Sequence, residues 1–250
     1  SFRTSTFLAK RLLRIYPIYW MSLVVAVAAV LLRSWLRTGD LLASFPKLHG
    51  ADITLGLTGT YAFAGGWGGP FNGVTWFVAL ILSMYFLYPL LARMFRRHPH
   101  LSILVLAVIS VGARLLIGKY KLISNRPLDW FPLCRVFEFG LGMYLAIVLS
   151  KVPWKLPSAP HWLGRLLSFL GKVTFPLFLV HYPVIFLVGH FRKSGMSQGW
   201  SITAFLGISL VLAMLVQFLD ERVPRRWILK KLGIRQDGKV VRIMVVRSVH

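Results

Sequence analysis

The amino-acid sequence predicts an all-α protein, a polytopic bundle of transmembrane helices. The 250 residues are 56% hydrophobic and 15% charged, whereas soluble domains average about 45–50% apolar and about 25% charged residues. The mean hydropathy is +0.67. The apolar residues gather in runs of about 20, which is the length that a helix needs to cross the hydrocarbon of a bilayer.

Six apolar runs are long enough, or nearly long enough, to span a membrane. In chain order they are residues 15–36, 74–92, 101–117, 130–150, 173–189 and 200–219, of which the third is the shortest. A seventh run, 53–63, is too short and is rich in glycine and threonine, so we expect a re-entrant or interfacial segment. It belongs to a long loop, 41–73, with many glycine and aromatic residues. Three prolines in 152–160 favour a short turn between two spans.

The charge balance is strongly basic, with 30 Lys and Arg against 7 Asp and Glu, a net charge of +23. Such an excess is typical of nucleic-acid-binding proteins and of membrane proteins with basic cytoplasmic loops. With six spans and a cytoplasmic N-terminus, nineteen of the 30 basic residues are cytoplasmic, eight are outside and three lie in or beside spans. The bias favours six spans over seven, with both termini in the cytoplasm. Because these charges are scattered over loops, we expect no nucleic-acid partner.

The sequence offers little to a metal ion or a disulfide. Cys134 is the only cysteine, so no intramolecular disulfide and no cysteine-rich metal site can form. We expect no metal cofactor.

Ionisable residues inside the predicted spans need an explanation, because a charge at the bilayer centre costs about 2.5–3.5 kcal/mol on insertion scales. Arg135 and Glu138 are three residues apart on one helix and can form an ion pair, either structural or part of a site. His181 lies in mid-span, where a packing role is the commoner alternative. Asp220 and Glu221 end the last span beside arginines, as a solvated interfacial cluster would.

A basic cluster precedes the first span. Arg11 and Arg14 lie on one face of a predicted helix at the cytoplasmic boundary, and we expect Pro17 to break that helix as the span begins. Two guanidinium groups presented together suit phosphate oxygens, because each offers a rigid fork of donors. Ordinary positive-inside anchoring explains the same residues, so spacing alone favours anchoring.

Five segments, in the same order, resemble those of acyltransferase family 3, a family of integral-membrane O-acyltransferases. They are residues 9–19 (AKRLLRIYPIY), 75–89 (beginning TWFVAL), 135–143 (RVFEFGLGM), 170–183 (LGKVTFPLFLVHYP) and 220–227 (DERVPRRW). Each segment alone is weak, but five in order are a specific match. The resemblance assigns residues 1–228 to this membrane domain and leaves 229–250 as a basic cytoplasmic tail.

The resemblance implies transfer of an acyl group, usually acetyl, from cytoplasmic acyl-CoA to a hydroxyl of a glycan or another small acceptor. Carried over to this chain, Arg11 and Arg14 would bind the phosphates of the coenzyme. The residues implied as catalytic are His181, Glu138 and Arg135, and those implied as substrate-binding are Trp76 and Tyr85. The implied partners are acyl-CoA, the acceptor and the lipid bilayer, and the implied location is the bacterial inner membrane.

The resemblance begins at the third helix of the family. We therefore expect an N-terminally truncated chain, whose first two family helices, with the histidine usually assigned as the base, lie upstream of Ser1 or on a partner subunit. Residues 81–83 hold no acidic side chain, which many members have at this point. The spacing to Pro224 leaves open whether Asp220 or Glu221 is the matching acid.

Two other interpretations fit the sequence. A membrane transporter or flippase-like module for acyl groups or acylated products would use Arg135, Glu138 and His181 as a polar path without catalysis. An inactive relic of the family would keep the helices and lack the base. An acyl-CoA-dependent transfer assay separates the first from an enzyme, and the sequence upstream of Ser1 bears on the second.

Overall fold

The computed structural model describes residues 4–43, 45–64, 68–121, 127–151 and 160–233. These residues form helices and no strands. Six of the helical segments are long and apolar enough to cross a membrane, by length and composition. They coincide with the six predicted runs, which confirms an all-α polytopic bundle.

The helices differ from the predicted runs mainly in length. The six long helices are α1 (Thr4–Thr38), α3 (Trp76–Arg97), α4 (Pro99–Tyr120), α6 (Pro132–Leu149), α7 (His161–Lys193) and α8 (Gln198–Glu221). The short elements are α2 (Gly50–Thr58), the 3₁₀ turns η1 (Tyr61–Ala64) and η2 (Gly73–Thr75), α5 (Pro127–Trp130) and α9 (Arg225–Lys231). The run 53–63, predicted to be re-entrant or interfacial, folds as α2 and η1, and both are too short to cross a bilayer.

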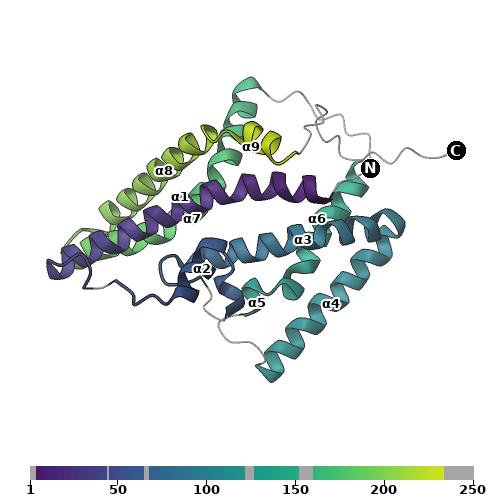
Figure 1. The fold of residues 1–250 in the computed structure, drawn as a ribbon, viewed down its shortest axis with the longest axis horizontal. Helices are drawn as coiled ribbons and strands as arrows, with labels where there is room; N and C mark the ends of the chain where they lie inside the picture. Colours follow the sequence, from purple (N-terminus) through teal and green to yellow (C-terminus); the bar gives the residue numbers. More distant parts are fainter. Residues whose placement is uncertain (1–3, 44, 65–67, 122–126, 152–159, 234–250) are drawn as a thin grey trace.

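The long helices form two groups that meet at α3 (Figure 1). Helix α1 packs along α7, α7 packs along α8, and the C-terminal ends of α1 and α7 lie near the start of α8. Helices α4 and α6 pack on each other and on α3. One apolar core joins α1, α3, α7 and α8 around Tyr19 and Leu179. A second core joins α3, α4 and α6 around Phe95 and Leu106.

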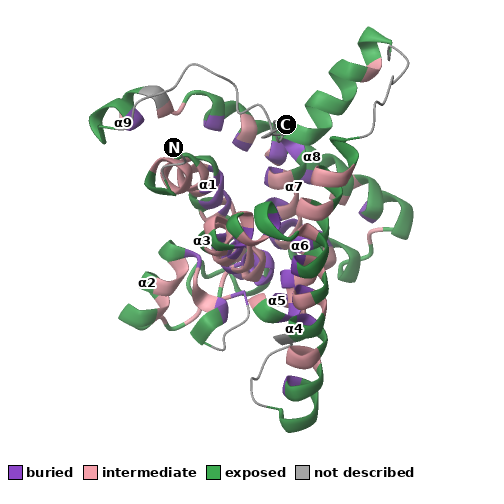
Figure 2. Cartoon of the chain, turned by 90° about the vertical axis from the view of Figure 1, so that its right-hand side faces the viewer, coloured by how far each residue is buried: buried purple, intermediate pink, exposed green. Residues whose placement is uncertain are grey.

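The helices are exposed over much of their length (Figure 2), and many of their exposed residues are large and apolar. Trp200, Val24 and Leu115 are 72%, 70% and 67% exposed. A soluble protein rarely exposes continuous apolar surfaces of this kind, whereas the hydrocarbon of a bilayer surrounds them without cost. The outer surface is therefore suited to lipid.

The prediction that Pro17 breaks its helix is wrong, because α1 continues through Pro17 for a total of 35 residues. A proline removes one backbone hydrogen bond and crowds the carbonyl four residues earlier, which here belongs to Leu13. Membrane helices tolerate this loss where another group pairs with the freed carbonyl. Nε of Arg225 donates to the Leu13 oxygen at 3.1 Å.

Two predicted segments fall partly outside the described residues. Residues 152–159 belong to the predicted turn before α7, and residues 234–250 belong to the predicted basic tail. Helix α9 runs across the boundary between residues 228 and 229, where the family resemblance places the start of that tail.

Candidate functional site

The predicted donor-binding arginines lie on the N-terminal third of α1, which packs against α3. The guanidinium carbon of Arg11 lies 5.2 Å from the ring centroid of Phe7 and 5.5 Å from that of Tyr85. Phe7 in turn stacks on Tyr88, with 4.6 Å between the ring centroids. The structure thus brings Arg11 together with Tyr85, a predicted substrate-binding residue. Arg14 is exposed, about one turn further along α1.

The arginine pair keeps its capacity to bind an anion. Within the part of the chain that the structure describes, neither Arg11 nor Arg14 forms an ion pair with a carboxylate. A guanidinium that rests on an aromatic ring still presents its N–H donors at its edge, where a phosphate can accept them in pairs. The aromatic rings therefore orient Arg11 without neutralising it.

His181 lies near the middle of α7 and is half-buried. Its ring centroid is 5.7 Å from that of Phe178, which makes an edge contact with Phe77 at 5.0 Å. Phe77 follows Trp76 at the start of α3, so aromatic rings connect His181 with the predicted substrate-binding tryptophan. Among the described residues, His181 forms no hydrogen bond or ion pair with the predicted catalytic pair on α6.

Asn72 links the loop before α3 to the turn of α7 that carries His181. This side chain is 1% exposed. Its Nδ2 donates to the Leu179 carbonyl at 2.8 Å, and its Oδ1 accepts from the Val74 amide at 3.3 Å. The next residue, Gly73, lies so close to Tyr182 that an added Cβ would stand 2.5 Å from the phenol oxygen. The sequence pattern does not single out Asn72, because its partner is 107 residues away.

A pocket of about 180 Å³ opens beside this turn, between the C-terminal parts of α1 and α7 and the loop 69–73. The side chains that give it chemical character are Arg33, Phe71, Tyr182 and Phe186. The guanidinium carbon of Arg33 lies 5.5 Å from the Phe186 ring centroid. A cation and a phenol among aromatic rings can orient a polar ligand that has a flat apolar face.

Arg135 and Glu138 form the predicted ion pair, with 3.4 Å between Nη1 and Oε1. The sequence pattern does not predict that Arg114 of α4 also pairs with Glu138, and that its Nε and Nη2 donate to the Cys134 carbonyl at 2.9 and 2.7 Å. Arg135 reaches Asp129 of α5 at 3.5 Å. These contacts join α4, α5 and α6, as expected if the Arg135–Glu138 pair has a structural role. A part of this pair in catalysis stays a prediction.

The end of α8 departs from the expected solvated cluster. Asp220 is only 4% exposed and pairs with Arg225 at the start of α9. Glu221 is exposed and pairs with Lys172 of α7 at 2.9 Å. Of the two candidate acids, Asp220 is thus the one that pairs with the arginine following Pro224.

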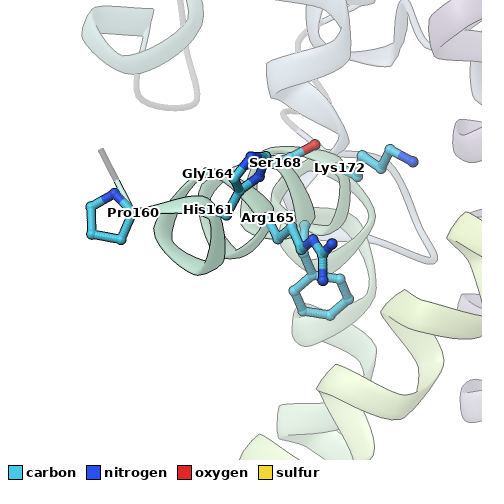
Figure 3. A pocket seen from close by; sticks show the side chains of 7 residues that line it. Pro160, His161, Gly164, Arg165, Ser168 and Lys172 are labelled. Carbon is cyan, nitrogen blue, oxygen red and sulfur yellow. The ribbon is translucent and has the colours of Figure 1, made fainter. Parts of the chain in front are cut away.

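A second hollow, of about 500 Å³, follows the first turns of α7 (Figure 3). Its basic side chains are His161, Arg165 and Lys172. All of the lining residues that the structure describes lie on this helix or next to its start, so the hollow is an open groove along one helix. Within the described residues, no group of three His, Cys, Asp or Glu side chains is placed to hold a metal ion.

A comparison with protein families identifies the chain. The profile of a family described as an acyltransferase domain matches residues 2–159, which is more than half of the chain and includes Arg11, Trp76 and Arg135. His181 and Asp220 lie beyond the matched residues. No curated protein and no solved structure matches the chain. With this match and the six apolar helices among its described residues, the chain belongs to acyltransferase family 3 and is an integral membrane protein.

Proposed function

We propose that this protein is a membrane O-acyltransferase that moves an acyl group, in particular acetyl, from acyl-CoA to a hydroxyl of a glycan or another small acceptor. We place it in the bacterial inner membrane, as the family resemblance implies. We orient both termini of the chain toward the cytoplasm, because basic residues concentrate on the cytoplasmic side in the six-span topology. The observation that carries the proposal is that the arginine pair and the pocket beside the His181 turn lie toward opposite ends of α1.

The separation matches the thickness of a membrane. Arg11 contacts Tyr85 near the N-terminal end of α1, and Ala29 of the same helix lines the pocket that Tyr182 also lines. At about 1.5 Å per residue, the distance along the helix from residue 11 to residue 29 is about 27 Å, and the hydrocarbon core is about 30 Å thick. Coenzyme phosphates bound at Arg11 and Arg14 would therefore face the cytoplasm, while the acceptor would bind at the other end.

The proposed reaction is attack of the acceptor hydroxyl on the thioester carbonyl. Neutral His181 takes the hydroxyl proton as the new C–O bond forms, and the proton passes to the sulfur as the C–S bond breaks. The products are an O-acyl ester and the free thiol of CoA. Arg135 and Glu138 remain predicted catalytic residues. A positioned donor such as the Arg135 guanidinium can stabilise the negative charge that develops on the thioester oxygen.

The acceptor side suits a sugar. The rings of Phe71, Tyr182 and Phe186 can pack against the C–H face of a sugar, while Arg33 and the Tyr182 hydroxyl can bond its oxygens. Trp76 would add a further aromatic surface through its neighbour Phe77, which joins the ring contacts of His181. A glycan hydroxyl is accordingly the acceptor that we favour over a lipid hydroxyl.

The test is transfer of radiolabelled acetyl from acetyl-CoA to envelope polysaccharide by the purified protein in lipid vesicles. Replacing Arg11 and Arg14 together by alanine should reduce transfer to background. The matched control replaces Arg96 and Arg97, two exposed arginines at the end of α3, and should keep the wild-type rate. Wild-type transfer by the Arg11, Arg14 variant would contradict the coenzyme site. Movement of acylated product across the vesicle without release of CoA would favour a transporter.

A further inference from the structure

Prolines inside the membrane helices leave backbone carbonyls without their usual donors. Among the described helices, the interior prolines are Pro17 in α1, Pro89 in α3, and Pro176 and Pro183 in α7. Each lacks an amide hydrogen, so the carbonyl four residues earlier loses its helical partner. Where lipid or packed side chains exclude water, nothing replaces that partner, so a carbonyl freed there is a strong acceptor for a donor from elsewhere.

Two of the freed carbonyls accept hydrogen bonds from side chains that are remote in sequence. Pro17 frees Leu13, which accepts from Arg225 at 3.1 Å across 212 residues. Pro183 frees Leu179, which accepts from Asn72 at 2.8 Å across 107 residues. For the carbonyls freed by Pro89 and Pro176, the structure shows no side-chain donor among the described residues.

The Arg225 contact joins three helices at the end of α1 that carries the arginine pair. Arg225 begins α9, and it pairs with the buried carboxylate of Asp220 at the end of α8. Asp220 neutralises the guanidinium, so that Arg225 can enter the protein and still donate to Leu13. Leu13 lies between Arg11 and Arg14 in α1, so the contact holds the turn that presents both guanidinium groups.

The Asn72 contact acts in the same way on α7. The Leu179 carbonyl lies two residues before His181, on the turn that carries the imidazole. Asn72 is itself held by the Val74 amide, and its own carbonyl accepts from the Thr75 hydroxyl at 2.9 Å. The start of α3 and the turn of His181 are therefore joined through one buried amide.

We propose that Arg225 and Asn72 are positioning residues that act through the carbonyls freed by Pro17 and Pro183. Arg225 fixes the turn of α1 that binds the coenzyme phosphates, and Asn72 fixes the turn of α7 that holds His181. Their effect on catalysis rests on the proposed function, whereas the coupling of each side chain to its proline does not.

A double-mutant cycle tests the pairing of Arg225 with Pro17. Pro17→Ala returns a backbone amide donor to the Leu13 carbonyl. In that background, Arg225→Ala no longer leaves this carbonyl without a donor, so its effect should be smaller. We expect Arg225→Ala to weaken binding of CoA, measured by titration of the purified protein, about tenfold when Pro17 is present. In the Pro17→Ala background the loss should be at least threefold smaller. The effect on Asp220 occurs in both backgrounds and cancels from the comparison.

Controls separate a specific contact from general damage. Arg225→Lys keeps a charged donor and should retain most of the CoA affinity. Pro89→Ala restores a donor to a carbonyl that Arg225 does not contact, so in that background Arg225→Ala should weaken CoA binding as much as in the wild type. Equal losses in the wild-type and Pro17→Ala backgrounds would overturn the pairing.

The Asn72 cycle uses a kinetic readout. Asn72→Ala should lower kcat for acetyl transfer about tenfold with little change in KM for acetyl-CoA, because the turn of His181 moves and the arginines do not. Pro183→Ala should reduce this effect, and Pro176→Ala should not. The lost contact with Val74 is common to all backgrounds and cancels. A change in the KM for acetyl-CoA alone would contradict the role.

Thermal unfolding of the same variants keeps the two proposals distinguishable. If the wild type neither binds CoA nor transfers acetyl, the proposed function fails, and the shifts in Tm alone decide the pairing. Non-additive shifts for Arg225 with Pro17, and for Asn72 with Pro183, then support the two contacts. Additive shifts overturn them.

Discussion

Asp52 shows how a single carboxylate organises the segment between α1 and α3. Its Oδ1 accepts a hydrogen bond from the Tyr61 hydroxyl at 2.6 Å, and its Oδ2 accepts from the His49 backbone amide at 2.8 Å. The bond from Tyr61, followed by that from His49, lowers the pKa of Asp52 because both favour the ionised form. The hydrogen bond between Tyr61 and Asp52 also raises the pKa of the Tyr61 hydroxyl.

A prediction at this scale concerns acid stability. The unfolded carboxyl has the higher pKa and binds a proton first, so the contact stabilises α2 above about pH 4 and is lost as the pH falls through the lowered pKa of Asp52. Tyr61→Phe should raise that pKa toward its ordinary value and make α2 less stable above about pH 4. Hydrogen exchange of residues 50–58, corrected for intrinsic rates, measures this between about pH 3 and pH 6. An unchanged acid profile in the variant would exclude Tyr61 as the cause.

Helices α4 and α6 pack through a glycine. Gly140 of α6 is buried, and a Cβ added there would overlap Cδ1 of Leu106 on α4. Gly142, two residues later, is exposed and has no atom within 4 Å of an added Cβ. The two glycines of one short segment therefore differ in what they do, although they are equivalent in the sequence pattern.

We expect Gly140→Ala to lower the free energy of unfolding by about 1–3 kcal/mol, because the packed interface must move to admit the methyl group. Gly142→Ala is the matched control and should be neutral or raise it by up to about 1 kcal/mol, through helix propensity. Leu106→Ala should destabilise the Gly140→Ala variant less than it destabilises the wild type, since it removes the overlap. Denaturant unfolding in micelles measures all three. Similar effects of the two glycine substitutions would contradict this account of the interface.

The helices also show which parts of the fold can be predicted from the sequence. Runs of about 20 apolar residues predict all six spans, because solvation of a helix by lipid depends on local composition. The extent of α1 cannot be predicted in this way, because the basic residues and Pro17 would interrupt an isolated helix at this point. In the protein, Phe7 stacks on Tyr88 and Arg225 pairs with Leu13, so the helix extends back to Thr4.

The residues of the candidate site can be predicted from the sequence only where they lie close together along the chain. Arg11 with Arg14, and Arg135 with Glu138, stand three residues apart, so helical geometry predicts each pair. Asn72 and Arg114 carry no such signal, because their partners lie 107 and 24 residues away. Arg225 belongs to the segment 220–227 and pairs with nearby Asp220, but its contact with Leu13 spans 212 residues and has no local signal. Only the packing of the helices, including α9 against α1, reveals these distant contacts.

Over the whole molecule, the distance between the arginine pair and the pocket constrains the donor. The span of about 27 Å along α1 separates a site suited to phosphates from a site suited to a sugar. If the donor is acyl-CoA, as we propose, its long and flexible pantetheine arm would have to place the thioester near His181 while the phosphates stay at Arg11. On this proposal, the phosphates and the thioester of one donor would be bound by different parts of the protein.

This division predicts how a truncated donor behaves. S-acetyl pantetheine keeps the thioester arm and has no phosphate, so the wild type should use it less efficiently than acetyl-CoA. Arg11→Ala should lower kcat/KM for acetyl-CoA about tenfold or more, and should change that for S-acetyl pantetheine less than about twofold. His181→Gln should slow transfer from both donors alike, because each delivers the same thioester to the same imidazole. If Arg11→Ala slows both donors equally, Arg11 supports the packing of α1 on α3 through Phe7 and Tyr85, and the phosphates bind elsewhere.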